Sequence, residues 1–441
     1  KHMDNLFSSF DATTKSEWIA LLEKELKGES IDQLQKVNPI EEIAYPSYFH
    51  RSDKGPELSD PGVADFTRGV QHTSNDWHVG TCFRITTTQA TNREILSALM
   101  AGTTALVVHA TDDATIDFSS LFSSVELQYI HTTFYPQTSE QAIDFGAFVG
   151  DNPAAIVCEF NQALLAKKEL FSNTNLRPYG VNAYAAQQAG ASTWQELAIA
   201  LATGHELLVQ QLDAGVAIDQ AANAIHFVLG IGNNYFFEIS KTRAFRSVWA
   251  QVVNAYEPKT ESAKKAIITA QTGFVRVSLK DPYTNLLRQT TEGMSAVIGG
   301  VFQLVIQPYD WHATPQKTDF TRRMATNISL LLKEESYMHH VIDPAGGAYA
   351  IDNLTVAIAE RTWSEFQWIE KNGGIEKTEV VAHLKASISE KASLRLEKVQ
   401  SKTDKIIGIN SFENPDKSDY QWQTTPTAWK GLSSLIIDKL V

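Results

Sequence analysis

The acid and base side chains that stand out in the sequence lie at the ends of short apolar runs. His109 ends a run that begins at Thr104, and Glu159 ends a run that begins at Ala154. If the two side chains meet at one edge of a sheet, they could act as a general acid and a general base. A histidine beside a turn is more often hydrogen-bonded or solvated than catalytic, so this pair is a weak candidate.

Other motifs that could bind a metal ion or a phosphate are weaker still. His339 and His340 are adjacent, and successive side chains of a regular strand face opposite ways, so both rings cannot bind one metal ion. No cysteine or acidic ligand has a matching spacing. The segment GIGNNY from Gly230 lacks the third glycine of a dinucleotide-binding loop, and AGGAY from Ala345 is typical of a turn. We therefore expect no metal site here.

The elements that would position these residues are eight short apolar runs separated by helical segments. The runs begin at Trp77, Thr104, Leu127, Ala154, Tyr179, Ile225, Ala266 and Phe302. They are continuous rather than alternating, as expected for strands buried on both faces, and their spacing of roughly 25 to 45 residues suits βα units. We therefore expect an α/β protein built on a (β/α)8 TIM barrel.

In such a barrel the catalytic groups lie at the C-terminal ends of the strands. The residues expected there are Arg84, His109, Thr132, Glu159, Tyr184, Gly230, Gln271 and Gln307. This set contains few acids, bases and nucleophiles. Taken alone, the residues predict a barrel that is poorly equipped for catalysis.

A helix is expected before the barrel, from Thr14 to Gly28. Thr14 and Glu17 have the spacing of a capping box, and Gly28 can end the helix. One apolar stripe is formed by Trp18, Leu21, Leu22 and Leu26. This stripe could pack on the helix's own domain or bind a partner.

The expected organisation has three parts. Residues 1–75 form an N-terminal helical and extended arm with a proline-marked connector, residues 76–400 form the barrel with its terminal helices, and residues 401–441 form an extended C-terminal tail. The helix near Thr318 to Glu335 and a long helix from Asn353 would close the barrel region.

The composition excludes several classes of protein. The 441 residues are 43% hydrophobic and 20% charged, as is typical of globular proteins. A formal net charge of -13 argues against a nucleic-acid binder, which would show a basic face. Cys82 and Cys158 are too few for a disulfide framework. No apolar run or leader suggests a membrane or an export signal, so we expect a cytoplasmic protein.

Several long blocks of the sequence resemble the barrel half of methylmalonyl-CoA mutase. They are AYAAQQAGASTWQELAIALATGHELLVQQL, QTGFVRVSLKDPYTNLLRQTTEGMSAVIGG and VIDPAGGAYAIDNLT, which match in order at consistent spacing. The resemblance covers roughly residues 175 to 412 well, and the N-terminal part more faintly, especially to the family's small subunits. It implies a mutase fold in which cobalamin generates a radical and CoA threads through a closing barrel.

Three positions depart from the motifs of the family's catalytic chains. Those chains carry R-P-W-T-I-R-Q-Y-A-G where this chain has SNDWHVGTCF, so alignment on Trp77 places Cys82 at the tyrosine that faces the substrate. They carry S-G-Y-H where this chain has NAYA, which places Ala185 at the histidine. They carry H-x-Q-T-S-G where this chain has TAQTGF, which places Thr269 at the active-site histidine. Neither a thiol nor a hydroxyl replaces a phenol or an imidazole in proton transfer.

The resemblance therefore implies a chain without catalytic residues. The cobalt-ligand loop D-x-H-x-x-G has no counterpart, so we expect no cobalamin domain in this chain and adenosylcobalamin on the partner. We expect the non-catalytic small, or beta, subunit of a heterodimeric methylmalonyl-CoA mutase, with the catalytic large, or alpha, subunit as its partner. Two alternatives stay open: an active barrel that uses a separate cobalamin chain, and a free-standing CoA-binding barrel. A CoA ester is a possible ligand in each case.

Overall fold

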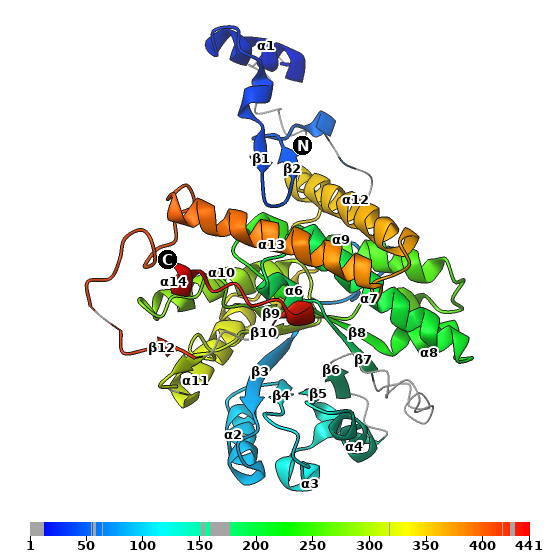
Figure 1. Cartoon of the computed structure of the whole chain (residues 1–441). Helices are drawn as coiled ribbons and strands as arrows, with labels where there is room; N and C mark the ends of the chain where they lie inside the picture. The colour runs from blue at the N-terminus through cyan, green and yellow to red at the C-terminus, as the bar shows by residue number, and fades with distance from the viewer. Residues whose placement is uncertain are drawn as a thin grey trace, which may run out of the picture.

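The computed structural model describes residues 13–441 except 54, 56–58, 64, 151–154, 159–176, 317, 417 and 424–427. A ring of parallel strands lies at the centre, and helices surround it (Figure 1). The N-terminal part projects from one end of the molecule, beyond the long helix α12 (Tyr349–Lys371). No helix among these residues is long and apolar enough to cross a membrane.

The central strands pair in chain order. They are β3 (His78–Arg84), β4 (Ala105–His109), β5 (His131–Tyr135), β6 (Ala155–Cys158), β7 (Arg177–Asn182), β8 (Ile225–Ile231), β9 (Ile268–Thr272) and β10 (Gln303–Val305). Each pairs in parallel with the next, and β10 also pairs with β3, which closes the ring. The pairing of β6 with β7 is irregular. Each apolar run of the sequence contains one of these strands, so the parallel α/β class is confirmed.

The outer face of the ring carries the main core. Large apolar side chains that point outward from the strands, such as Leu106, Phe134 and Phe227, are fully buried against the helices. Each such side chain contributes roughly 1.5–3 kcal/mol by leaving water. Strands buried in this way need continuous apolar runs, which is why the sequence pattern located them.

The helices between and after the strands form the outer layer. They are α2 (Thr88–Met100), α3 (Phe118–Leu121), α4 (Ser139–Val149), α6 (Tyr184–Gln188), α7 (Thr193–Asp213), α8 (Ile218–Asn223), α9 (Tyr235–Asn254), α10 (Thr284–Ile298) and α11 (Thr318–Leu330). The N-terminus of α7 is fixed by a capping box between Ser192 and Gln195. The segment between β6 and β7, residues 159–176, lies outside the described residues.

Two expected strand boundaries are wrong. Residues Leu127–Tyr129 form a short 3-10 helix, because the N–H of Tyr129 donates to the carbonyl of Glu126. As a result Thr132 lies near the start of β5, and Tyr135 occupies its C-terminal end. Tyr184 begins α6 rather than ending β7, since the preceding residue already has helical backbone angles.

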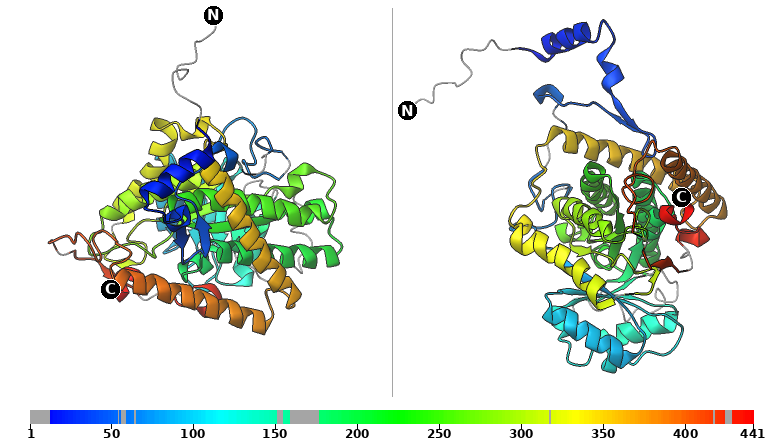
Figure 2. Two further views of the ribbon diagram at one scale, coloured as in Figure 1. Left: turned by 90° about the horizontal axis from the view of Figure 1, so that it is seen from above. Right: turned by 90° about the vertical axis from the view of Figure 1, so that its left-hand side faces the viewer.

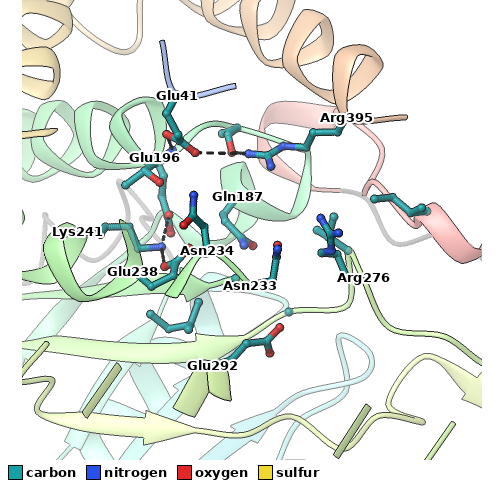
Figure 3. A pocket seen from close by; sticks show the side chains of 17 residues that line it. Glu41, Gln187, Glu196, Asn233, Asn234, Glu238, Lys241, Arg276, Glu292 and Arg395 are labelled. Atoms are coloured by element: carbon teal, nitrogen blue, oxygen red, sulfur yellow. Dashed lines mark hydrogen bonds and ion pairs between the residues drawn. The ribbon is translucent and has the colours of Figure 1, made fainter. Parts of the chain in front are cut away.

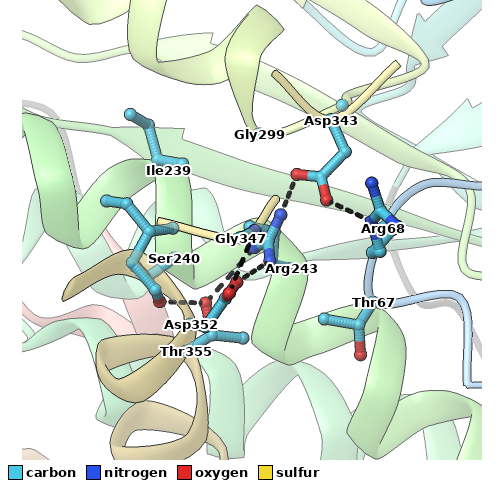
Figure 4. A network of polar contacts seen from close by, with 12 residues as sticks. Thr67, Arg68, Ile239, Ser240, Arg243, Gly299, Asp343, Gly347, Asp352 and Thr355 are labelled. Carbon is cyan, nitrogen blue, oxygen red and sulfur yellow. Dashed lines mark hydrogen bonds and ion pairs between the residues drawn. The ribbon is translucent and has the colours of Figure 1, made fainter. Parts of the chain in front are cut away.

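The long helix α12 is tied to the barrel by a buried ionic network (Figure 4). Arg243, on α9, is fully buried and pairs with Asp343 and with Asp352, the latter at 2.6 Å. Arg68, in the connector before the barrel, pairs with Asp343 at 2.8 Å. Three segments that are far apart in the sequence are therefore held together by ion pairs centred on the fully buried Arg243, with Arg68 partly exposed at the edge of the network. Removal of one partner from such a buried network typically costs about 3–5 kcal/mol.

The N-terminal arm has one anchored part and one free part. The antiparallel hairpin of β1 (Lys36–Asn38) and β2 (Ile43–Tyr45) is anchored through Glu41, which is buried. The Glu41 carboxylate accepts from the N–H of Thr193 at 2.8 Å, and its carbonyl accepts from the Trp194 indole at 2.9 Å. These bonds hold the hairpin against the N-terminus of α7.

The free part of the arm is helix α1 (Lys15–Glu25), which begins at the expected capping box of Thr14 and Glu17. No residue of α1 is buried. Trp18 packs edge-on against Tyr48 of the connector, with ring centroids 4.3 Å apart. In Figures 1 and 2 this helix stays away from the barrel. Its apolar stripe is therefore left largely uncovered.

The C-terminal segment has little regular structure, as expected, but it is packed against the barrel. The long helix α13 (Thr378–Gln400) precedes it, β12 (Gln421–Trp422) pairs with β11 (Ala313–Thr314), and α14 (Ile437–Leu440) ends the chain. Asp438 accepts hydrogen bonds from Ser278 and Leu279, both at 3.0 Å, and from Trp422 at 2.9 Å. The N–H of Leu435 donates to the carbonyl of Gln188 on α6. This segment therefore crosses the loops at the C-terminal ends of the strands.

Candidate functional site

The middle of the barrel is filled by apolar side chains. Cys82, Val107, Val228 and Val305 point inward and form a cluster of their own, and each is at most 1% exposed. Burial raises the pKa of the Cys82 thiol to about 12, so the thiol is neutral and a poor nucleophile. The cluster leaves Cys82 in contact with valines rather than with a reacting group.

Thr269 lies within the barrel beside a histidine from the neighbouring strand. Its Oγ1 atom is 2.9 Å from Nε2 of His226, which is fully buried. Burial lowers the pKa of His226 to about 3, so the ring is a neutral imidazole and cannot act as a cationic acid near neutral pH. The sequence analysis missed His226 because it lies at the second position of β8, far from the end of the strand. The signal was a lone histidine in the otherwise apolar run IHFVLGI.

A cavity of about 450 Å³ lies at the C-terminal mouth of the barrel. Five of the residues expected at strand ends line it, namely Arg84, His109, Tyr184, Gln271 and Gln307. Ala185 also lines it. Tyr135 and Asn182 line it too, and the sequence analysis missed them because it misplaced the ends of β5 and β7. Ala428 and Ser434 of the C-terminal segment close part of its wall. The structure thus brings most of the expected strand-end residues to one place.

The groups at this mouth have little acid or base chemistry near neutral pH. Burial lowers the pKa of His109 to about 3, and its ring stacks on Tyr135 with centroids 4.3 Å apart. Burial raises the pKa of Tyr184 well above its usual range, and its hydroxyl donates to Gln307 at 3.1 Å. The histidine is therefore a neutral ring and the tyrosine a neutral phenol. Glu159, the expected partner of His109, lies outside the described residues.

Among the described residues that line the mouth, Arg84 alone has a permanent positive charge. Its guanidinium lies 4.0 Å from the ring centroid of Trp311, which gives a cation–π contact. It forms no ion pair with any residue that the structure describes. The mouth is therefore an aromatic and polar cavity with a cation in its wall.

A second, smaller cavity of about 60 Å³ lies beside the ends of β8 and β9 (Figure 3). Lys241 lies 3.0 Å from Glu196 and 2.5 Å from Glu238, and all three side chains are buried. Burial raises the pKa of Glu196 to about 7, against the opposing charge of Lys241. The Glu196 carboxylate also accepts a hydrogen bond from the N–H of Gly230. Gly230, which was expected at a strand end, therefore contacts this cluster and not the cavity at the barrel mouth.

Glu292 also lines the smaller cavity, and its carboxyl group has no hydrogen bond or ion pair with a described residue. Burial raises its pKa to about 8, with a further contribution from Glu238 and opposing ones from Arg288 and Arg276. The cluster is therefore a buried, partly neutral acidic site around one lysine, with the features of structural packing rather than of a reaction centre.

No group of three or more metal-ligating side chains occurs in the described part of the chain. His339 and His340 lie in a short 3-10 helix with their rings 4.3 Å apart, and Nδ1 of His339 lies 2.8 Å from the carbonyl of Lys333. The described lining of the mouth also does not fit a corrinoid, because Ala428 and Ser434 of the C-terminal segment form part of the wall and both histidines of the lining are buried rather than presented as cobalt ligands. We derive no step through such a group in this chain.

Comparison with known proteins places these features in a family. A family model described as methylmalonyl-CoA mutase matches residues 169–430, more than half of the chain. A methylmalonyl-CoA mutase small subunit from Porphyromonas gingivalis is 31% identical over 94% of this chain and 72% of its own length. This chain belongs to the methylmalonyl-CoA mutase family.

Other relatives within the mutase family include both kinds of chain. A methylmalonyl-CoA mutase from Cereibacter sphaeroides is 29% identical over 90% of this chain and 64% of that protein. A methylmalonyl-CoA mutase small subunit from Propionibacterium freudenreichii subsp. shermanii is 26% identical over 92% of this chain and 70% of its own length. The chain thus spans about two thirds of the length of these relatives. The resemblance seen in the sequence is confirmed, and the family is one of adenosylcobalamin-dependent isomerases.

Proposed function

We propose that this chain is the non-catalytic small, or beta, subunit of a heterodimeric, adenosylcobalamin-dependent methylmalonyl-CoA mutase. In this proposal the large, or alpha, subunit interconverts methylmalonyl-CoA and succinyl-CoA and holds the cobalamin, and this chain stabilises it. Both chains act in the cytoplasm. The likeness to small subunits from two bacteria supports this assignment.

The observation that carries the proposal is the content of the barrel. Thr269, which matches the family's active-site histidine, is bonded to a neutral His226. Cys82, which matches the substrate-facing tyrosine, belongs to an apolar cluster that fills the barrel at mid-depth. Ala185, which matches the second histidine, adds only a methyl group to the mouth. None of these three positions supplies a group that gives or takes a proton near neutral pH, because the Cys82 thiol has a raised pKa and the other two carry a hydroxyl and a methyl group.

The arm supports a role in association. Trp18 is 39% exposed and Leu21 is 57% exposed on a helix that has no buried residue. Aromatic and leucine side chains are common anchors of stable interfaces. We infer that the arm and connector, residues 1–75, contact the large subunit, that residues 76–400 form a complete (β/α)8 barrel with its terminal helices, and that residues 401–441 form a separate C-terminal cover.

The decisive experiment is co-expression of this chain with the large subunit of the same organism. We expect a 1:1 complex in size-exclusion chromatography with light scattering, and mutase turnover that requires the large subunit. The isolated chain should neither turn over methylmalonyl-CoA nor retain cobalamin through purification. Turnover by the isolated chain with added adenosylcobalamin would overturn the proposal, and turnover with only a cobalamin-binding domain added would favour an active barrel with a separate cobalamin chain.

A further inference from the structure

Arg84 places a positive charge at a point where the related motif has no side chain. When SNDWHVGTCF is aligned with R-P-W-T-I-R-Q-Y-A-G on Trp77, the residue at Arg84 corresponds to the glycine of the catalytic motif. Arg84 brings a guanidinium to this position of the chain. Its position at the end of β3, in the wall of the 450 Å³ cavity, is a feature that the lost catalytic groups do not explain.

No described residue forms an ion pair with the guanidinium of Arg84. A guanidinium that is withdrawn from water is normally paired with a carboxylate, because an unpaired charge is costly to desolvate. Burial lowers the pKa of Arg84, and the opposing influence of Asp310 acts at a distance without an ion pair. Asp310 is buried and has contacts of its own. Trp311 covers one face of the guanidinium, so the N–H groups at its edge are left to meet a ligand.

The same cavity contains acceptors that have no donor. Oδ1 of Asn182 and Oε1 of Gln271 are buried and have no hydrogen-bond partner, and Nε2 of His109 is also unpaired. All three residues line the cavity with Arg84. Buried polar atoms of this kind are normally satisfied, so a ligand or ordered water that donates hydrogen bonds is needed here. The volume is within the range of small-molecule sites.

We propose that the barrel mouth binds a small hydroxycarboxylic acid. Its carboxylate pairs with the guanidinium of Arg84, and its hydroxyl donates to the side-chain oxygen of Asn182 or Gln271. Ser434 of the C-terminal segment forms part of the wall and covers the bound molecule. Among the described residues, the other titratable groups near the site are Asp310, which disfavours a second carboxylate beside Arg84, and the histidines His109 and His312, which burial keeps neutral. The site therefore selects a ligand with a single negative charge.

This binding site does not depend on the proposed subunit role, since it would be measured on the isolated full chain. The probe is L-lactate, titrated calorimetrically at low ionic strength, with propionate as the same molecule without the hydroxyl and inorganic phosphate as a different anion. We expect saturable lactate binding in the millimolar range or tighter. We expect propionate and phosphate to bind at least about tenfold more weakly, because they leave the buried oxygens unpaired or overcharge the site.

Variants assign the contacts. Arg84→Gln should weaken lactate binding by about thirtyfold or more, because a charge-assisted bidentate contact is lost. The affinity of Arg84→Lys for lactate should lie between those of the unaltered chain and Arg84→Gln. Arg93→Gln, at an exposed arginine of α2, is the matched control and should bind as the unaltered chain does. Asn182→Ala provides a second test if Arg84→Gln fails to fold. The proposal would be overturned by any of three results: no saturable binding, equal binding of lactate and propionate, or unchanged lactate binding by Arg84→Gln. Arg84 would then only fill space at the barrel mouth.

Discussion

The hydroxyl of Thr269 lies 2.9 Å from the imidazole of His226 inside the barrel, and it is the only hydrogen-bond partner of that ring among the residues described. Nδ1 of His226 already lacks a partner. Loss of the Thr269 hydroxyl would therefore leave both ring nitrogens of the buried His226 without a hydrogen bond.

Thr269→Val should destabilise the isolated chain. The substitution keeps the shape of the side chain but leaves both nitrogens of His226 unpaired, which costs about 1–3 kcal/mol. The free energy of unfolding from urea titration measures the loss. Thr133→Val is the matched control, because Thr133 is equally buried in the barrel but its hydroxyl has no partner. A loss of stability in the control as large as that of Thr269→Val would show that the His226 contact contributes nothing.

Thr269→His should not create mutase turnover. The position would regain an imidazole, but Cys82 and Ala185 would still lack the groups of the family motif, and the groups of a catalytic site act as a unit. The new ring would also crowd His226. Succinyl-CoA formation from methylmalonyl-CoA, measured with adenosylcobalamin and without the large subunit, checks this, with circular dichroism to show that the variant is folded. Turnover by this single variant would mean that most of the site is intact.

The strands were predictable from the sequence because parallel strands buried on both faces need continuous apolar runs. The family was predictable because long blocks match in order. The contacts of individual side chains were not predictable, because they join residues that are far apart in the chain. Arg84 contacts Trp311, and Glu41 contacts Thr193. A lone histidine such as His226 does not reveal its partner until the register of β8 and β9 is known.

Stability should depend on pH through Glu292. Burial raises the pKa of this carboxyl from 4.5 to about 8, so the folded chain binds a proton that the unfolded chain has released. The associated stability is complete below about pH 4.5 and is lost as the pH rises towards about 8. Glu292→Gln removes the ionisable group, so its stability relative to the unaltered chain should grow by a few kcal/mol from about pH 5 to about pH 8.

Urea unfolding at several pH values measures this difference. The exposed Glu379→Gln on α13 is the control, and its stability relative to the unaltered chain should not change with pH in that interval. Glu196, whose pKa is raised to about 7 by burial, contributes in the same direction but is present in all three proteins, so it cancels from the comparison. A stability difference for Glu292→Gln that stays constant across the interval would contradict the neutral carboxyl in the smaller cavity.

Alanine at Trp18 and Leu21 together should weaken association with the large subunit. Both side chains are exposed on α1, which has no buried residue, and truncation of such anchors in an interface costs about 2 kcal/mol or more. This corresponds to about a thirtyfold rise in Kd. The hairpin is left intact, because Glu41 anchors it to α7 and its loss would confuse the result.

Met100→Ala is the control, since Met100 is 90% exposed on α2 at the opposite end of the molecule (Figure 1). Binding measured by surface plasmon resonance should fall for the double variant and stay unchanged for the control, while thermal unfolding of the barrel is the same in both. If the double variant binds the large subunit as tightly as the unaltered chain, the arm does not form the interface.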